Sequence, residues 1–136
     1  MRHRKYKVQL GRRSDHVRSM LSNQAGSLIR EGRIKTTIPK AKAARRIAER
    51  MVTLAKAGDL ASRRRAISIL KDLPTVRHLF DTYGPLFADR QGGYTRIVRI
   101  GPRAGDSAEM CYLEWVEQPH TAPEQEPATA PETAEG

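Results

Sequence analysis

Positive charge is concentrated at the start of this chain more strongly than a compact fold tolerates on its own. The first fifty residues contain fifteen Lys or Arg and only three acidic residues. Six of these basic residues stand within residues 1–13, which contain no acid and no amphipathic period. Mutual repulsion on this scale opposes a compact monomer unless a polyanion neutralises it. The sequence therefore predicts a nucleic-acid partner, and an extended arm of residues 1–13 that becomes ordered on it.

The other interpretations of residues 1–13 are a targeting peptide and a solvated tail. A secretory signal needs an apolar region after its basic residues, and a transit peptide is amphipathic and rich in serine; neither pattern is present. The chain has one cysteine, Cys111, so it forms no intramolecular disulfide, which fits a reducing compartment such as the cytoplasm. No run of about eighteen apolar residues occurs, so we expect no membrane segment.

The end of the chain has the opposite character. Residues 119–136 contain four Glu, four Pro and no Lys or Arg. With those four acids set aside, the net charge of +10 on the whole chain becomes +14 on residues 1–118. Such a segment has almost nothing to bury, so we expect a disordered acidic tail. A single globular domain is then expected over residues 14–118.

Apolar residues recur at helical spacing between residues that start or stop helices, which predicts four helices. Their expected bounds are Ser14 or Asp15 as N-cap to Gly32, Pro39 to Gly58, Asp59 as N-cap to about Lys71, and Pro74 to the Gly84-Pro85 break. Alternating or β-branched runs predict strands at 34–38, 94–100 and 109–116, and GPRAGDSA between the last two predicts a hairpin loop. The expected fold class is α+β, with about four helices packed on a small, largely antiparallel three-stranded sheet.

No pattern typical of an enzyme or a metal centre is present. The four histidines have no metal-ligand spacing, and one cysteine cannot form a zinc knuckle. Cys111 stands in a strand-like run and is expected to be a small buried hydrophobe. The Gln91-Gly92-Gly93 segment lacks the spacing of a nucleotide-binding loop. We therefore predict no catalytic residue, no metal and no cofactor.

Beyond the arm, basic residues cluster near 40–46, at 63–65 and around the glycine pair. Lys42, Arg45 and Glu49 share a helical face, so part of the first cluster is also consistent with a solvated, ion-paired surface. Arg90 and Arg96 flank Tyr94, an arrangement that suits phosphate contacts beside a ring stacked on a base. For Tyr94 itself, packing in the sheet is an equally good interpretation. Gly92 and Gly93 are expected either to have positive φ or to let the backbone at this point lie close to a partner.

Several longer segments occur in an order that resembles one protein family. They are MRHR at 1–4, LGR at 10–12, His16, GRIKTT at 32–37, KAK at 40–42, LAKAGDL at 54–60, ADRQGGYTRI at 88–97 and GPRAGD at 101–106. Through residue 117 or so, the chain resembles the family of the seventeenth protein of the bacterial large ribosomal subunit. The resemblance implies a cytoplasmic, non-enzymatic structural protein that is a monomer within the ribosome. Its implied partners are large-subunit ribosomal RNA and neighbouring large-subunit proteins.

The alternative from the residues alone is a nucleoid component or a translational repressor that uses the same basic surfaces. Combining the clusters with the matched segments gives the expected RNA-binding residues. They are Arg2, His3, Arg4, Lys5, Lys7, Arg12, Arg13, His16, Arg33, Lys35, Lys40, Lys42, Arg90, Gly92, Gly93, Tyr94 and Arg96.

Overall fold

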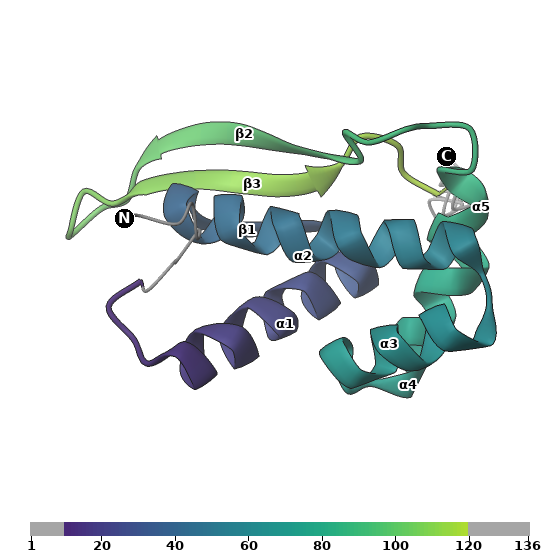
Figure 1. Cartoon of the computed structure of the whole chain (residues 1–136). Coiled ribbons are helices and arrows are strands. Elements are labelled where there is room, and N and C mark those ends of the chain that lie inside the picture. Colours follow the sequence, from purple (N-terminus) through teal and green to yellow (C-terminus); the bar gives the residue numbers. More distant parts are fainter. Residues whose placement is uncertain (1–9, 120–136) are drawn as a thin grey trace, which may run out of the picture.

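The computed structural model describes residues 10–119, and it confirms the α+β class with helices packed on a three-stranded antiparallel sheet. The predictions for residues 1–9 and 120–136 lie outside the described residues. The elements in chain order are α1 Ser14–Glu31, β1 Arg33–Thr37, α2 Ile38–Ala57, α3 Leu60–Leu70, α4 Leu73–His78, the π-helical turn η1 Leu79–Tyr83, α5 Gly84–Leu86, β2 Thr95–Pro102 and β3 Glu109–Trp115. The sheet forms one layer and the helices lie on one side of it (Figure 1).

β3 is the central strand, because β1 and β2 both pair with it in an antiparallel arrangement. The predicted hairpin joins β2 to β3, and a register irregularity lies between Arg99 and Gly101. Side chains alternate along β3, so Cys111, Leu113 and Trp115 face the helices and are fully buried. Cys111 is thus the small buried residue that was predicted, and burial raises the pKa of its thiol.

The core is centred on Trp115. Its ring lies 4.8 Å from the Tyr83 ring and 5.9 Å from the Phe87 ring, measured between centroids. The indole Nε1 donates a hydrogen bond to the carbonyl of Leu28 at 3.1 Å. Trp115 therefore ties the central strand both to α1 and to the segment that follows α4.

α2 packs against the sheet and has α1 on its other side (Figure 1). Its buried face is rich in alanine, and Ala41, Ala44 and Ala48 have no exposed surface. Small side chains let the helix approach both neighbours closely. Ile47 and Leu54 of the same helix are larger and only half-buried.

Three predicted helix ends are confirmed. Gly32 and Gly58 end α1 and α2 in the left-handed conformation, and the Asp59 side chain accepts the Ser62 N–H at the start of α3. The prediction of Ser14 or Asp15 as the N-cap of α1 is wrong. The N-cap is Arg13, because the helix already includes Ser14 and the Arg13 carbonyl accepts the Val17 N–H at 2.9 Å.

The predicted break at Gly84-Pro85 is also wrong. The chain continues from α4 through η1 into α5, and the Gly84 N–H donates to the carbonyl of Leu79. Pro85 has no N–H to donate, and the path continues past it because the Phe87 N–H donates to the carbonyl of Tyr83 at 3.1 Å. No helix within residues 10–119 has the length and apolar character needed to cross a membrane.

Candidate nucleic-acid interface

The predicted RNA-binding residues that the structure describes form two groups. Arg2, His3, Arg4, Lys5 and Lys7 lie outside the described residues. The first group surrounds β1 and the starts of α1 and α2, and it comprises Arg12, Arg13, His16, Arg33, Lys35, Lys40 and Lys42. The second lies between α5 and β2 and in β2 itself, and it comprises Arg90, Gly92, Gly93, Tyr94 and Arg96.

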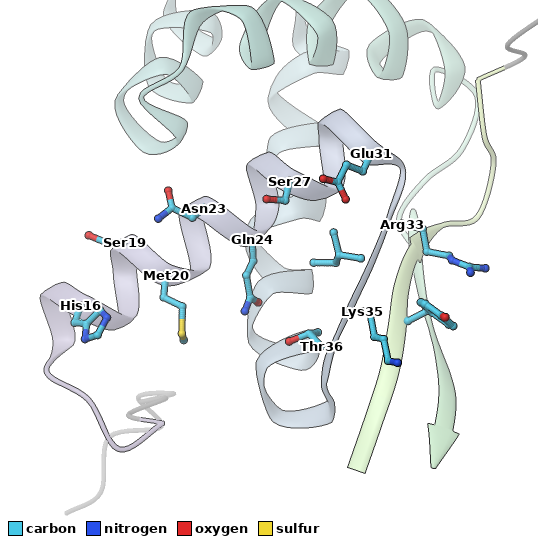
Figure 2. Close-up of a pocket in the computed structure, with 12 residues that line it drawn as sticks. His16, Ser19, Met20, Asn23, Gln24, Ser27, Glu31, Arg33, Lys35 and Thr36 are labelled. Carbon is cyan, nitrogen blue, oxygen red and sulfur yellow. The ribbon is translucent and has the colours of Figure 1, made fainter. Parts of the chain in front are cut away.

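The first group borders a groove between α1 and β1 with a volume of about 860 Å³, called here the α1–β1 groove (Figure 2). β1 is an edge strand, so nothing in the described part of the sheet pairs with the side of it that faces α1. The lining residues come from α1, β1 and one position of β3, and they are His16, Ser19, Met20, Asn23, Gln24, Ser27, Glu31, Arg33, Ile34, Lys35, Thr36 and Tyr112.

The groove carries more positive than negative charge. Arg33 and Lys35 alternate with inward-facing residues of β1, which places both side chains in solvent at one wall. The guanidinium of Arg33 lies over the Tyr112 ring, 3.8 Å from its centroid. On the α1 side, His16 Nε2 is 3.4 Å from Nη1 of Arg12. Glu31 is the one acidic side chain among the lining residues.

Lys40 and Lys42 extend this positive region into the first turns of α2, which begins directly after β1. Lys42 is exposed and Lys40 half-exposed. One helical turn later, Arg45 forms an ion pair with Glu49 at 3.6 Å. The expected ion-paired surface on α2 is therefore present.

In the second group, the structure favours packing over stacking for Tyr94. The residue is 5% exposed, and its ring lies 5.1 Å from the Phe87 ring. Its hydroxyl is 3.0 Å from Nζ of Lys56, and this hydrogen bond lowers the pKa of the phenol. Gly92 and Gly93 both have positive φ, as expected, and a Cβ built on either meets nothing within 4 Å. The pair thus has a conformational role in the turn.

The arginines of this group are paired with carboxylates of the chain. Arg90 lies 3.4 Å from Glu117, and Arg96 lies 2.8 Å from Glu114. The hairpin loop shows the same pattern: a hydrogen bond from Arg103 holds the pKa of Asp106 at about 2. In the part of the chain that the structure describes, Arg33, Lys35, Lys40 and Lys42 form no such ion pair. These four residues therefore form one group of basic side chains without a carboxylate partner, around the α1–β1 groove.

The register connects the two groups. Glu114 lies opposite Arg33 on one side and opposite Arg96 on the other, so these three side chains share the sheet face that carries no helix. Tyr112 stands at the centre of this face, between Lys35 and Val98. Sequence reasoning missed Tyr112, although its place between the inward-facing Cys111 and Leu113 is the signal of an outward-facing residue.

Sequence reasoning also missed Gln24 of α1. Its Oε1 is buried and is the single buried side-chain oxygen or nitrogen of the described residues with no hydrogen-bond partner. A polar residue on a helix gives no sequence signal that distinguishes this environment from a solvated one. No cluster of His, Cys, Asp or Glu suited to a metal ion occurs within residues 10–119.

The sequence matches known proteins over most of its length. The model of a family described as "Ribosomal protein L17" matches residues 20–116. The chain is also similar to "Large ribosomal subunit protein bL17" of Finegoldia magna, with 52% identity over 109 residues. That match covers 80% of this chain and 83% of the relative.

Proposed function

This chain belongs to the ribosomal protein L17 family of the bacterial large ribosomal subunit, and from that premise we propose that it binds and helps stabilise large-subunit ribosomal RNA. It acts there as a structural constituent rather than as an enzyme. Its partners are this RNA and the neighbouring proteins of the subunit, in the bacterial cytoplasm, and it is present as a monomer.

The observation that carries the proposal is the distribution of unpaired positive charge. Arg13, Arg30, Arg45, Arg90, Arg96 and Arg103 are matched by carboxylates of the chain itself. Arg33 and the three lysines around the α1–β1 groove have no such match among the described residues. Lys and Arg side chains that replace counterions on RNA phosphates gain affinity by releasing those ions. The groove region is therefore one part of the described surface that suits a polyanion.

In this role the chain binds RNA and holds it in place, and it does not turn over a substrate. The deep major groove of duplex RNA is too narrow for side chains to read, so specificity comes from shape and from unpaired segments. Arg12 and Arg13 stand at the junction between residues 1–9 and α1, beside His16 at one end of the groove. In the sequence, residues 2–7 contain four further Lys or Arg.

Fractionation of cell extracts on a density gradient tests the proposal. We expect the tagged chain to sediment with the large subunit at moderate salt. Arg33→Gln combined with Lys35→Gln should reduce this association, whereas Arg64→Gln with Arg65→Gln removes the same charge from exposed positions of α3 and should reduce it less. Recovery with DNA or in the unbound fractions would instead support a nucleoid component or a translational repressor.

A further inference from the structure

We propose that an extended peptide of a neighbouring large-subunit protein pairs with β1 in the α1–β1 groove, with acidic side chains beside Arg33 and Lys35. It adds a strand at the side of β1 that β3 does not occupy, called here the free edge. This inference rests on the proposed function, since it gives a surface and a chemistry to one of the proposed protein partners.

The free edge carries backbone groups that the described sheet does not use. The Trp115 N–H donates to the Gly32 carbonyl at 3.4 Å, and backbone bonding alternates along an antiparallel strand. Ile34 therefore bonds to β3, whereas the N–H and C=O groups of Arg33 and Lys35 point away from it. Within the part of the chain that the structure describes, these groups make no backbone hydrogen bond to another segment. An added strand supplies the partners that they lack.

The α1–β1 groove gives an added strand room beside this edge. Its volume is about 860 Å³, and α1 and β1 form its two walls (Figure 2). The five residues of β1 span about 17 Å, which is the length of edge open to pairing. On the α1 side, Ser19, Asn23 and Ser27 present short uncharged side chains, and Met20 and Ile34 add half-buried apolar surface. The peptide therefore turns small or apolar side chains toward α1.

Arg33 and Lys35 determine the charge of the peptide. Every second side chain of a strand added to β1 lies beside them, on the sheet face that carries no helix. Opposite charges on neighbouring strands stabilise the pairing, and like charges oppose it. Neither residue has a carboxylate partner among the described residues. The peptide therefore carries Asp or Glu at alternate positions.

Charge and composition disfavour an occupant from this chain or from a second copy of it. Antiparallel pairing of two β1 strands about Lys35 would place two lysines opposite each other. Residues 2–7 would bring four Lys or Arg against Arg33 and Lys35. Residues 119–136 contain four Pro, which lack the N–H that strand pairing requires.

RNA is the competing occupant of a different class. Its phosphates accept hydrogen bonds from N–H groups and from the side chains of Arg33 and Lys35, but they donate nothing to the carbonyls of the free edge. A polypeptide backbone matches both kinds of group at the spacing of a strand. Lys40 and Lys42 follow β1 on α2 and stay available to RNA. RNA in the groove is therefore an outcome of the test.

Amide hydrogen exchange, measured by mass spectrometry at residue resolution, tests the backbone pairing. In the isolated chain we expect the Lys35 amide to exchange rapidly, because its N–H points away from β3. In purified large subunits that contain the chain, it should exchange at least about tenfold more slowly. The Ile34 amide bonds to β3 and should exchange slowly in both, which makes it the internal control. Equally rapid exchange of Lys35 in the subunit would overturn the inference.

A crosslink from the groove identifies the occupant. Cys111 is buried and is the only cysteine, so Asn23→Cys places one accessible thiol in the groove wall for a photoactivatable label. In assembled large subunits we expect adducts to one segment of a neighbouring protein, with Asp or Glu at alternate positions. Arg18→Cys, which is exposed on α1 outside the groove, should not form this adduct. Adducts to RNA, to a second copy or to this chain itself would overturn the inference.

Two substitutions of Lys35 separate backbone pairing from charge. Lys35→Pro removes an N–H that β3 does not use, and an edge strand tolerates proline where its N–H would point outward. Lys35→Gln keeps the N–H and removes the charge. Combined with the labelled Asn23→Cys, Lys35→Pro should abolish the adduct and Lys35→Gln should only reduce it.

Melting of the isolated variants checks that they fold. If Lys35→Pro melts far below the unaltered chain, exchange of the Lys35 amide in the unaltered chain decides the question. An adduct that survives Lys35→Pro in a folded chain would contradict strand addition. Failure of the unaltered chain to enter the large subunit would instead contradict the proposed function.

Discussion

Gly84 marks the closest approach of the α4–α5 segment to α2. Its φ of −56° is ordinary for a helix, so backbone conformation does not require glycine here. A Cβ added at this position would lie 2.9 Å from the carbonyl oxygen of Ala55, which is backbone and cannot move by a side-chain rotation. The glycine is therefore required by contact between two elements, which explains why a Gly-Pro pair stands inside a continuous helical path.

Gly84→Ala should destabilise the fold by about 1–3 kcal/mol, because α2 and α5 must separate to admit the methyl group. Gly26→Ala is the matched control, since Gly26 is also helical and its added Cβ would meet only the side chain of Arg30 at 3.3 Å. Urea unfolding of both variants, followed by circular dichroism, gives the two free energies. Equal costs for the two substitutions would show that contact with Ala55 is not the reason for the glycine.

At the scale of elements, α2 determines how closely the layers approach. Ala44 and Ala48 are fully buried on a helix that touches all three strands and α1. Larger residues on this face would force the sheet and α1 apart. The alanine face thus fixes the position of β1 relative to α1, and with it the width of the α1–β1 groove.

Ala48→Leu should accordingly cost about 1–3 kcal/mol through overpacking. Ala57→Leu places the same side chain at an exposed position in the last turn of α2 and should change stability little. Thermal melting of the two variants distinguishes these outcomes. A decrease at Ala57 as large as that at Ala48 would mean that leucine acts through helix propensity rather than through packing.

Local signals account for the elements that the sequence predicts correctly. Gly32, Gly58 and Asp59 end or start helices through contacts within a few residues, and the hairpin depends on the turn residues between β2 and β3. The wrong break at Gly84-Pro85 and the open choice at Tyr94 involve contacts between separate elements. The path through Gly84 depends on Ala55, and burial of Tyr94 depends on Phe87 and Lys56.

The difference between local signals and contacts between separate elements also applies to the candidate site. Basic clusters are visible in the sequence, so the residues at the groove were among those expected. Whether each arginine is already paired depends on the strand register, as with Arg96 and Glu114, which stand eighteen positions apart. Gln24 and Tyr112 both line the groove only because β1 returns beside α1 and pairs with β3.

At the scale of the whole molecule, the charge distribution relates the fold to its partner. The +14 on residues 1–118 is divided between pairs that the fold satisfies and cations that it leaves unpaired. Leu10 packs against the core, and the Arg13 carbonyl holds the first turn of α1. A deletion that tests the arm without disturbing the fold should therefore stop before Leu10.

The dependence of RNA affinity on salt concentration measures how many phosphates the chain neutralises. We expect binding of the full chain to in-vitro-transcribed large-subunit ribosomal RNA to weaken by about three orders of magnitude or more between ~50 and ~200 mM salt. Deleting residues 2–9, which contain four Lys or Arg, should leave the melting temperature nearly unchanged. It should lower the slope of log affinity against log salt by roughly one unit for each phosphate that the shortened chain no longer neutralises. A flat salt dependence for the full chain, or equal affinity and slope for the two proteins, would contradict the account.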